Sequence, residues 1–126
     1  MSFSVDVSKF VKKTNANAEK LSRAIPIALF NGVIRKTRVD TGRLRGNWQT
    51  TTNIPATIEL ERYDSPGTQG TGRNATNEVK MSVQSFSITY LTNNLPYAEV
   101  YEEKDAMIQS QIQRINRIIK EAVNNL

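Results

Sequence analysis

The chain has 126 residues, of which 38% are hydrophobic and 23% charged, and this balance excludes a disordered tail and a membrane-embedded protein. It contains no cysteine and no histidine, which excludes disulfides and removes the commonest general base and transition-metal ligand. The 17 Lys and Arg against 12 Asp and Glu give a net charge of +5, which is compatible with a polyanionic partner without identifying one. The longest apolar run, residues 24–30, is too short to cross a bilayer, and the N-terminus lacks the pattern of a secretory signal, so no membrane contact is expected.

A long N-terminal helix is predicted from Asp6 or Ser8 to about Lys36, because apolar and small residues recur there at spacings of three and four. Pro26 has no N–H and crowds the preceding turn, so the helix is expected to kink or restart at that point. Beyond it the apolar surface widens, which indicates burial between a sheet and a second helix, or a face that meets another subunit. The stripe consists of Val7, Val11, Thr14, Ala18, Leu21, Ile25, Ala28 and Gly32.

About four antiparallel strands are predicted after this helix. The first follows an Asp-Thr-Gly turn, in which Asp40 can bond onward to the backbone and Gly42 can take a positive φ. Alternating β-branched, aromatic and polar residues predict the other strands. Residues 64–77 contain three glycines and nothing apolar larger than alanine, so we expect a long flexible loop there. The predicted strands span 48–53, 56–63, 79–83 and 86–92.

The C-terminal stretch, from about Glu102 to Asn125, is predicted to be one amphipathic helix. Its isoleucines recur every three or four residues, so this helix should pack on the sheet. Strands grouped between terminal helices indicate the α+β class, with an antiparallel sheet covered on one face. No repeat or boundary divides residues 1–126, so a single domain is expected. The apolar stripe consists of Ile108, Ile112, Ile115, Ile119 and Ala122.

Two sequence features are compatible with a small-ligand site, but neither predicts one. Glu59 and Glu61 share a face of a predicted strand near Asp64, as ligands of a Mg²⁺ nuclease would, but outward carboxylates on a strand are usually only solvated. The glycine-rich stretch 67–73 lacks the Gly-Lys-Ser/Thr of a phosphate-binding loop and should join two strands. No metal, cofactor or catalytic residue is therefore predicted.

A dense basic segment follows the first helix. Arginines suit phosphate contacts, and Trp48 and Tyr63 are of a type that stacks on bases. The alternative interpretation is an exposed helix end, where cations favour the C-terminal dipole. A small basic nucleic-acid-binding module therefore stays open as a function. The segment contains Arg35, Lys36, Arg38, Arg43 and Arg45, and Arg73 lies in the predicted loop.

Two segments resemble the signatures of one protein family. VDTGRLRGNW (39–48) resembles a Val-Asp-Thr-Gly-Arg-x-Arg-x-Asn-Trp motif, and ITYLTNNLPYAEVYE (88–102) resembles a strand followed by Asn-Asn-Leu-Pro-Tyr-Ala. Both are signatures of the tail-completion, neck or minor tail-component proteins of tailed bacteriophages, which build the head–tail connector. The order of helix, first signature, strands with a variable loop, second signature and last helix is also similar.

The resemblance implies a virion structural protein and no enzyme activity. Proteins of this family form rings, usually hexameric, at the head–tail junction or the top of the tail, where they complete the tail and join it to the DNA-filled capsid. The expected partners are further copies of the chain, other neck, connector and tail-tube proteins, and genomic DNA passing through the ring, with no cofactor. The chain would be made in the cytoplasm of a bacterial host and located in the virion.

The signature residues are the candidate contacts between subunits or rings. Tyr97 and Tyr101 can serve as interface residues with an apolar body and a polar tip, or they can cover the core under the last helix. The loop 64–77 is a candidate to reach a neighbouring ring or the lumen. The candidate interface residues are Asp40, Arg43, Arg45, Trp48, Asn94, Tyr97, Tyr101 and Glu102. The residues expected near DNA are Arg35, Lys36, Arg38 and Arg73.

Overall fold

The computed structural model describes residues 1–6, 16–65 and 73–126, and these residues form an α+β domain, as the sequence predicts. The strands are not grouped between two terminal helices as expected, because helices lie between them in the sequence. Within the described part of the chain, no helix is long and apolar enough to cross a membrane. In chain order the elements are β1 (Ser2–Val5), α1 (Ala16–Lys36), α2 (Arg43–Gly46), β2 (Trp48–Thr52), α3 (Asn74–Ser82), β3 (Thr89–Asn93), α4 (Ala98–Asp105), α5 (Met107–Ile112) and α6 (Ile115–Asn124).

The sheet has the order β1–β3–β2, and the central strand β3 is antiparallel to both neighbours. Leu91 of β3 lies opposite Phe3 of β1 and Thr50 of β2. Because side chains alternate between the two faces of a strand, these three residues share the face that carries the core. The other face is polar and presents Ser, Thr, Gln and Tyr side chains, Tyr90 among them.

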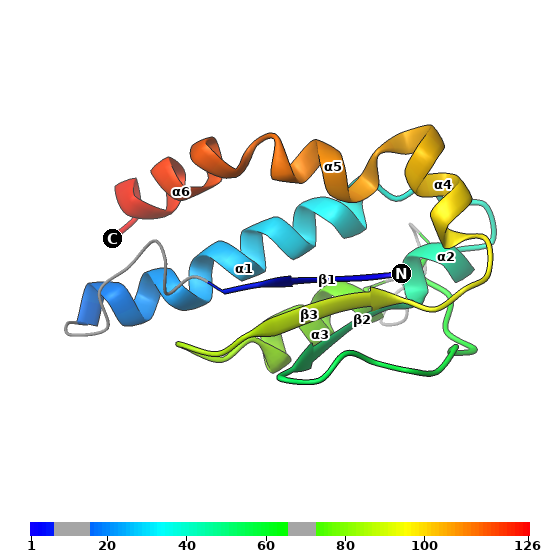
Figure 1. The fold of residues 1–126 in the computed structure, drawn as a ribbon, viewed down its shortest axis with the longest axis horizontal. Coiled ribbons are helices and arrows are strands. Elements are labelled where there is room, and N and C mark those ends of the chain that lie inside the picture. The colour runs from blue at the N-terminus through cyan, green and yellow to red at the C-terminus, as the bar shows by residue number, and fades with distance from the viewer. Residues whose placement is uncertain (7–15, 66–72) are drawn as a thin grey trace.

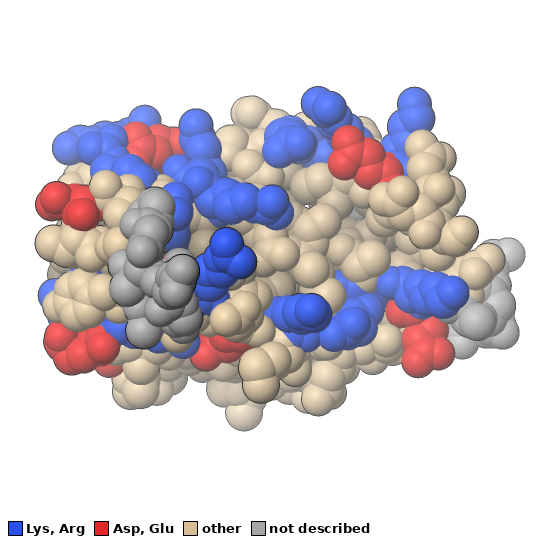
Figure 2. Space-filling model, turned by 180° about the vertical axis from the view of Figure 1, so that it is seen from behind, with Lys and Arg blue, Asp and Glu red and all other residues tan. Residues whose placement is uncertain are grey.

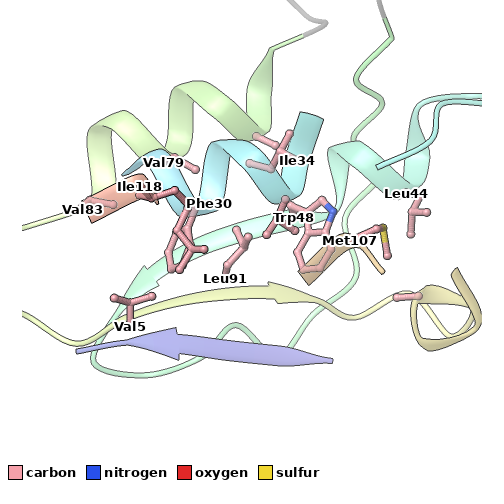
Figure 3. Close-up of a cluster of buried hydrophobic side chains, with 14 of the residues drawn as sticks. Val5, Phe30, Ile34, Leu44, Trp48, Val79, Val83, Leu91, Met107 and Ile118 are labelled. Atoms are coloured by element: carbon pink, nitrogen blue, oxygen red, sulfur yellow. The ribbon is translucent and has the colours of Figure 1, made fainter. Parts of the chain in front are cut away.

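The helices lie in layers on the core side of the sheet. Both α1 and α3 pack there, with α3 against β2, and α5 and α6 run along α1 (Figure 1). Figure 3 shows side chains from these helices and from the sheet converging in the space between them. Phe30 of α1, Val79 of α3, Leu91 of β3 and Met107 of α5 are all fully buried in this core. One continuous core therefore fixes the relative positions of most elements.

The N-terminal region differs from the expectation in two ways. The residues before Asp6 form β1, an edge strand that sequence reasoning did not predict. The helix α1 runs from Ala16 to Lys36 and continues through Pro26, so the alternative that a second helix starts there is wrong. The predicted helix start at Ser8 lies outside the described residues.

The predicted strand at 79–83 is wrong, because most of it belongs to helix α3. Ala75, Val79 and Val83, four residues apart, are buried, whereas Met81 is 84% exposed. Burial at every fourth residue is typical of a helix, whereas a strand would bury every second residue. The exposure of Met81 therefore agrees with the helix. The helix begins inside the predicted loop 64–77, whose residues 66–72 lie outside the described part of the chain.

The predicted strand at 56–63 is also wrong. This segment lies beside β2 but joins no ladder, because side-chain amides take the place of strand pairing. Asn47 accepts from the Leu60 N–H at 2.7 Å and donates to Leu60 O at 3.0 Å, and Gln49 donates to Ile58 O at 2.7 Å. Ile58 is exposed, so it does not share a buried face with Leu60 as the alternation suggested.

The expected single C-terminal helix is three short helices, α4, α5 and α6. The first break is at Ala106, which has φ 49° and ψ 51°. This left-handed conformation cannot continue a right-handed helix, so α4 ends there. The carboxylate of Glu102 then accepts the Ile108 and Gln109 N–H groups at 2.8 and 3.1 Å. This side chain satisfies the free donors at the start of α5. Helices α5 and α6 pack on α1 rather than on the sheet, and α4 contacts α5.

Candidate functional site

The two signature segments form one structural unit. Trp48 and Asn93 are paired across strands β2 and β3. The fully buried Asn93 amide donates to Leu44 O at 2.8 Å, and its carbonyl accepts the Leu95 N–H at 3.3 Å. A buried amide with partners on both sides is well satisfied. Asn93 therefore ties the turn after β3 to helix α2 of the first signature.

The glycines of the first signature allow another segment to approach α2 closely. Gly42 has φ 92°, a conformation that favours glycine, and the turn expected there is confirmed. A Cβ on Gly46 would lie 2.2 Å from Arg62 O and one on Gly42 would lie 2.7 Å from Asp64 O. Both distances are shorter than van der Waals contact to backbone atoms that are held in place, so these positions accept no side chain.

Trp48 lies in the core and not at an interface. Its side chain is 0% exposed and lies among the core residues (Figure 3). Its indole N–H donates to Thr37 Oγ1 at 2.8 Å. The Thr37 hydroxyl in turn donates to Val33 O at 2.8 Å, one turn back in α1. The candidate roles of Trp48 in subunit contact and in base stacking are therefore corrected, because burial leaves none of the ring available.

Three further signature residues form hydrogen bonds from their side chains to backbone groups of other segments. Arg45 donates to Arg35 O at 3.2 Å and to Thr37 O at 2.8 Å, at the end of α1. Partial burial lowers the pKa of Arg45, and the nearby charge of Asp64 partly offsets this effect. Asn94 donates to two carbonyls of the 56–58 segment, and Glu102 binds the start of α5 as described above. These contacts give each residue a structural role within one subunit.

The other candidate interface residues are more accessible. Arg43 lies 3.3 Å from Glu61 and 3.8 Å from Glu59, and Asp40 is exposed. The two carboxylates that resemble a metal site thus share one arginine as their ion-pair partner. No group of three or more possible metal ligands occurs among the residues that the structure describes.

The two tyrosines of the second signature pack against each other and against the core. Their rings are 5.9 Å apart in an edge-to-face arrangement, and Tyr101 also carries the Arg38 guanidinium 4.7 Å above its ring. Both side chains are half-buried and contact the core cluster. Arg38 binds Asp105 through two hydrogen bonds of 2.6 Å. The tyrosines therefore cover the core, as one of the two interpretations predicted, and their role in a subunit interface stays a prediction.

The Arg38–Asp105 pair predicts a specific pH dependence. The hydrogen bonds from Arg38 hold the pKa of Asp105 below its ordinary value of 3.8, and Lys36 and Lys104 act in the same direction. Stability from this carboxylate is therefore present above the ordinary pKa and is lost as the pH falls through the lowered one. Near neutral pH the free energy of unfolding, measured with urea, should be lower for Asp105→Asn than for the wild type by a constant amount. In acid the two free energies should converge. A difference that persists unchanged in acid would contradict this assignment.

Sequence reasoning missed the ion pair that closes the outer edge of β2. Arg62 donates to Gly46 O at 2.6 Å and to Trp48 O at 2.7 Å, and it pairs with Glu78 at 3.0 Å. Glu78 also accepts the Thr50 N–H at 2.9 Å. These side chains bond backbone N–H and C=O groups at the edge of β2, so those groups are not available to pair with another strand. A charged pair 16 residues apart in the sequence gives no local signal of this contact.

The residues expected near DNA do not form one cluster. Arg35 and Lys36 line a groove of about 500 Å³ between α1 and the α5–α6 helices, where they are joined by Arg114. Arg38 is paired with Asp105, and Arg73 precedes α3 and does not line this groove. Arg114 was not among the predicted residues, because nothing in the sequence places it beside the end of α1.

Lys and Arg side chains spread over one face of the molecule. Figure 2 shows them along the upper border, where Figure 1 places α4, α5 and α6, and across the middle, with fewer acidic residues between them.

Comparison of the chain with protein-family models, with curated proteins and with solved structures finds no match.

Proposed function

We propose that the chain is the subunit of a ring, expected to be hexameric, at the head–tail junction or the top of the tail of a tailed bacteriophage. In this role it completes the tail and joins it to the DNA-filled capsid, and it needs no catalytic residue. The observation that carries the proposal is the presence of both signature segments, 39–48 and 88–102, in one small α+β domain. Their contact through Asn93 supports it, because motifs that depend on each other for folding should occur together.

Three exposed apolar side chains are compatible with subunit contacts. Ile54 and Met81 are more than two-thirds exposed and Ile88 is 42% exposed. Ile54 follows β2, Ile88 precedes β3 and Met81 lies in α3. The Asn53 N–H donates to Ile88 O, and Thr52 donates to Ser82 O at the end of α3, so these segments meet at one end of the sheet. Apolar side chains gathered on a surface are typical of interaction sites.

The test removes the chain from the phage that encodes it. Without the protein, DNA-filled heads and separate tails should accumulate, and supplying the protein from a plasmid should restore joined, infectious particles. A reconstruction of the neck should then contain a closed ring of this chain. Fully infectious particles that lack the protein, or particles that hold it as a single copy outside any ring, would refute the proposal.

A small nucleic-acid-binding module remains the second candidate, and the cationic groove beside Arg35 and Lys36 is the observation that favours it. The two functions differ in where the protein is found. A nucleic-acid-binding module should be free of the purified virion and should bind DNA as a monomer or dimer, which light scattering of the complex would show.

A further inference from the structure

The groove between α1 and the α5–α6 helices is formed by a close helix contact. Gln111 of α5 is almost fully buried against Gly32 of α1, where a Cβ would lie 2.1 Å from the Gln111 Oε1 atom. This contact brings Arg114, at the junction of α5 and α6, to the same groove as Arg35 and Lys36 at the end of α1. One groove is thus lined by three cations, although Arg114 lies 78 residues after Lys36 in the sequence.

The charges around the groove are not balanced by acidic partners. Its one acidic lining residue, Glu121, is already bonded to Arg117 at 3.1 Å. Among the described residues, the only hydrogen bond of the Arg35 side chain goes to Asn31 O, at 3.2 Å, and Lys36 makes no ion pair within 4 Å, although its charge acts on Asp105, which is itself bonded to Arg38. The groove therefore presents cationic groups that keep their charge available for a ligand.

The C-terminal end of α1 does not repel an anion bound in the groove. The last carbonyls of a helix carry partial negative charge and repel anions when they are bare. Here Arg45 donates to Arg35 O and Thr37 O, and the Thr37 N–H donates to Val33 O and Ile34 O. Because these carbonyls are already bonded, the side chains of Arg35 and Lys36 determine the local charge.

We propose that this groove binds the sugar–phosphate backbone of double-stranded DNA. The proposal rests on the proposed function, in which DNA passes the ring, and it specifies which face of the subunit meets it. Arginine and lysine side chains are the usual phosphate contacts. Three cations from separate elements line this groove, so it can contact several phosphates of an extended polyanion rather than a single small phosphate.

The experiment measures binding of a short fluorescein-labelled DNA duplex by anisotropy, at several salt concentrations. The groove variant carries Arg35→Gln, Lys36→Gln and Arg114→Gln. Its affinity should fall by about tenfold or more, and its log–log salt slope by about 2–3, since each lost phosphate contact removes about 0.9 from that slope. Far-UV circular dichroism should show both proteins equally folded, because none of these side chains lies in the core.

The control carries Lys20→Gln, Lys80→Gln and Lys104→Gln, which removes the same charge from exposed residues outside the groove. It should keep the affinity and the salt slope of the wild type. Equal losses in both variants would show attraction by net charge alone and overturn the proposal, as would absence of binding to the duplex. Competition by an excess of mononucleotide would assign a small-phosphate pocket and also overturn it.

The outcome is separable from that of the proposed function. A ring found in the virion together with an unaffected groove variant would leave the function intact and reject only this surface. Groove-dependent binding without incorporation into the particle would keep the surface and favour the nucleic-acid-binding module.

Discussion

Replacing Trp48 by alanine should lower the free energy of unfolding by about 3–5 kcal/mol, the range found when large core aromatics are truncated. This is a large part of the roughly 5–15 kcal/mol that stabilises a typical domain. The side chain is fully buried, and its removal also leaves the Thr37 hydroxyl without its indole partner. The measurement is urea unfolding followed by far-UV circular dichroism, because the variant loses the only tryptophan and with it the fluorescence signal.

Trp48→Phe is the matched control, since it keeps an aromatic ring in the core and removes the indole N–H. Its loss should be smaller, about 1–3 kcal/mol for part of the packing and one buried hydrogen bond. If Trp48→Ala unfolded at the same urea concentration as the wild type while ring assembly was lost, the side chain would act at an interface and its burial would have been misjudged.

The position of Trp48 changes what the first signature means. Core packing restricts which side chain fits at Trp48, and the nearby backbone of Arg62 leaves no room for a side chain at Gly46. Arg45 is required because it donates to carbonyls at the end of α1. A motif of this kind is needed for folding whatever the subunit binds. Contacts that belong to assembly should therefore be sought outside it, among exposed residues such as Ile54 and Met81.

Elements with strong local signals could be predicted from the sequence. The spacing of apolar residues indicated α1, the Asp-Thr-Gly turn depends on Gly42, and β2 and β3 lie within the predicted ranges 48–53 and 86–92, apart from Asn93 at the end of β3. In each case a few adjacent residues determine the conformation. The α+β class followed from their order and is confirmed.

Elements that depend on distant residues could not be predicted. The alternation of Val79, Met81 and Val83 predicted a strand, but Val79 and Met81 lie in helix α3 and Val83 follows its end. Val79 and Val83, four residues apart, are buried and Met81 is exposed, which fits a helix and not a strand. The edge strand β1 has four residues and forms only by pairing with β3. The groove likewise depends on the packing of Gln111 against Gly32, which no spacing in the sequence reveals.

Replacing Asp64 by alanine should cost about 3 kcal/mol, because a buried carboxylate that accepts several N–H groups leaves all of them unsatisfied when it is removed. Asp64 is 1% exposed and accepts the Asn74 N–H at 3.1 Å, the Ala75 N–H at 2.7 Å and the Asn74 amide at 3.0 Å. It therefore satisfies free donors at the start of α3 from ten residues upstream. Amide hydrogen exchange should show the largest loss of protection in α3.

Asp64→Asn separates charge from shape, because it keeps one oxygen acceptor at the same place. It should lose about half as much stability, since hydrogen bonds to charged groups contribute roughly 1.5–3 kcal/mol and neutral ones about 1. If Asp64 instead belonged to a metal site with Glu59 and Glu61, added Mg²⁺ would raise the unfolding midpoint of the wild type and not of Asp64→Asn. The structure predicts no such shift, because Arg43 binds both glutamates and the Asp64 oxygens already accept N–H groups.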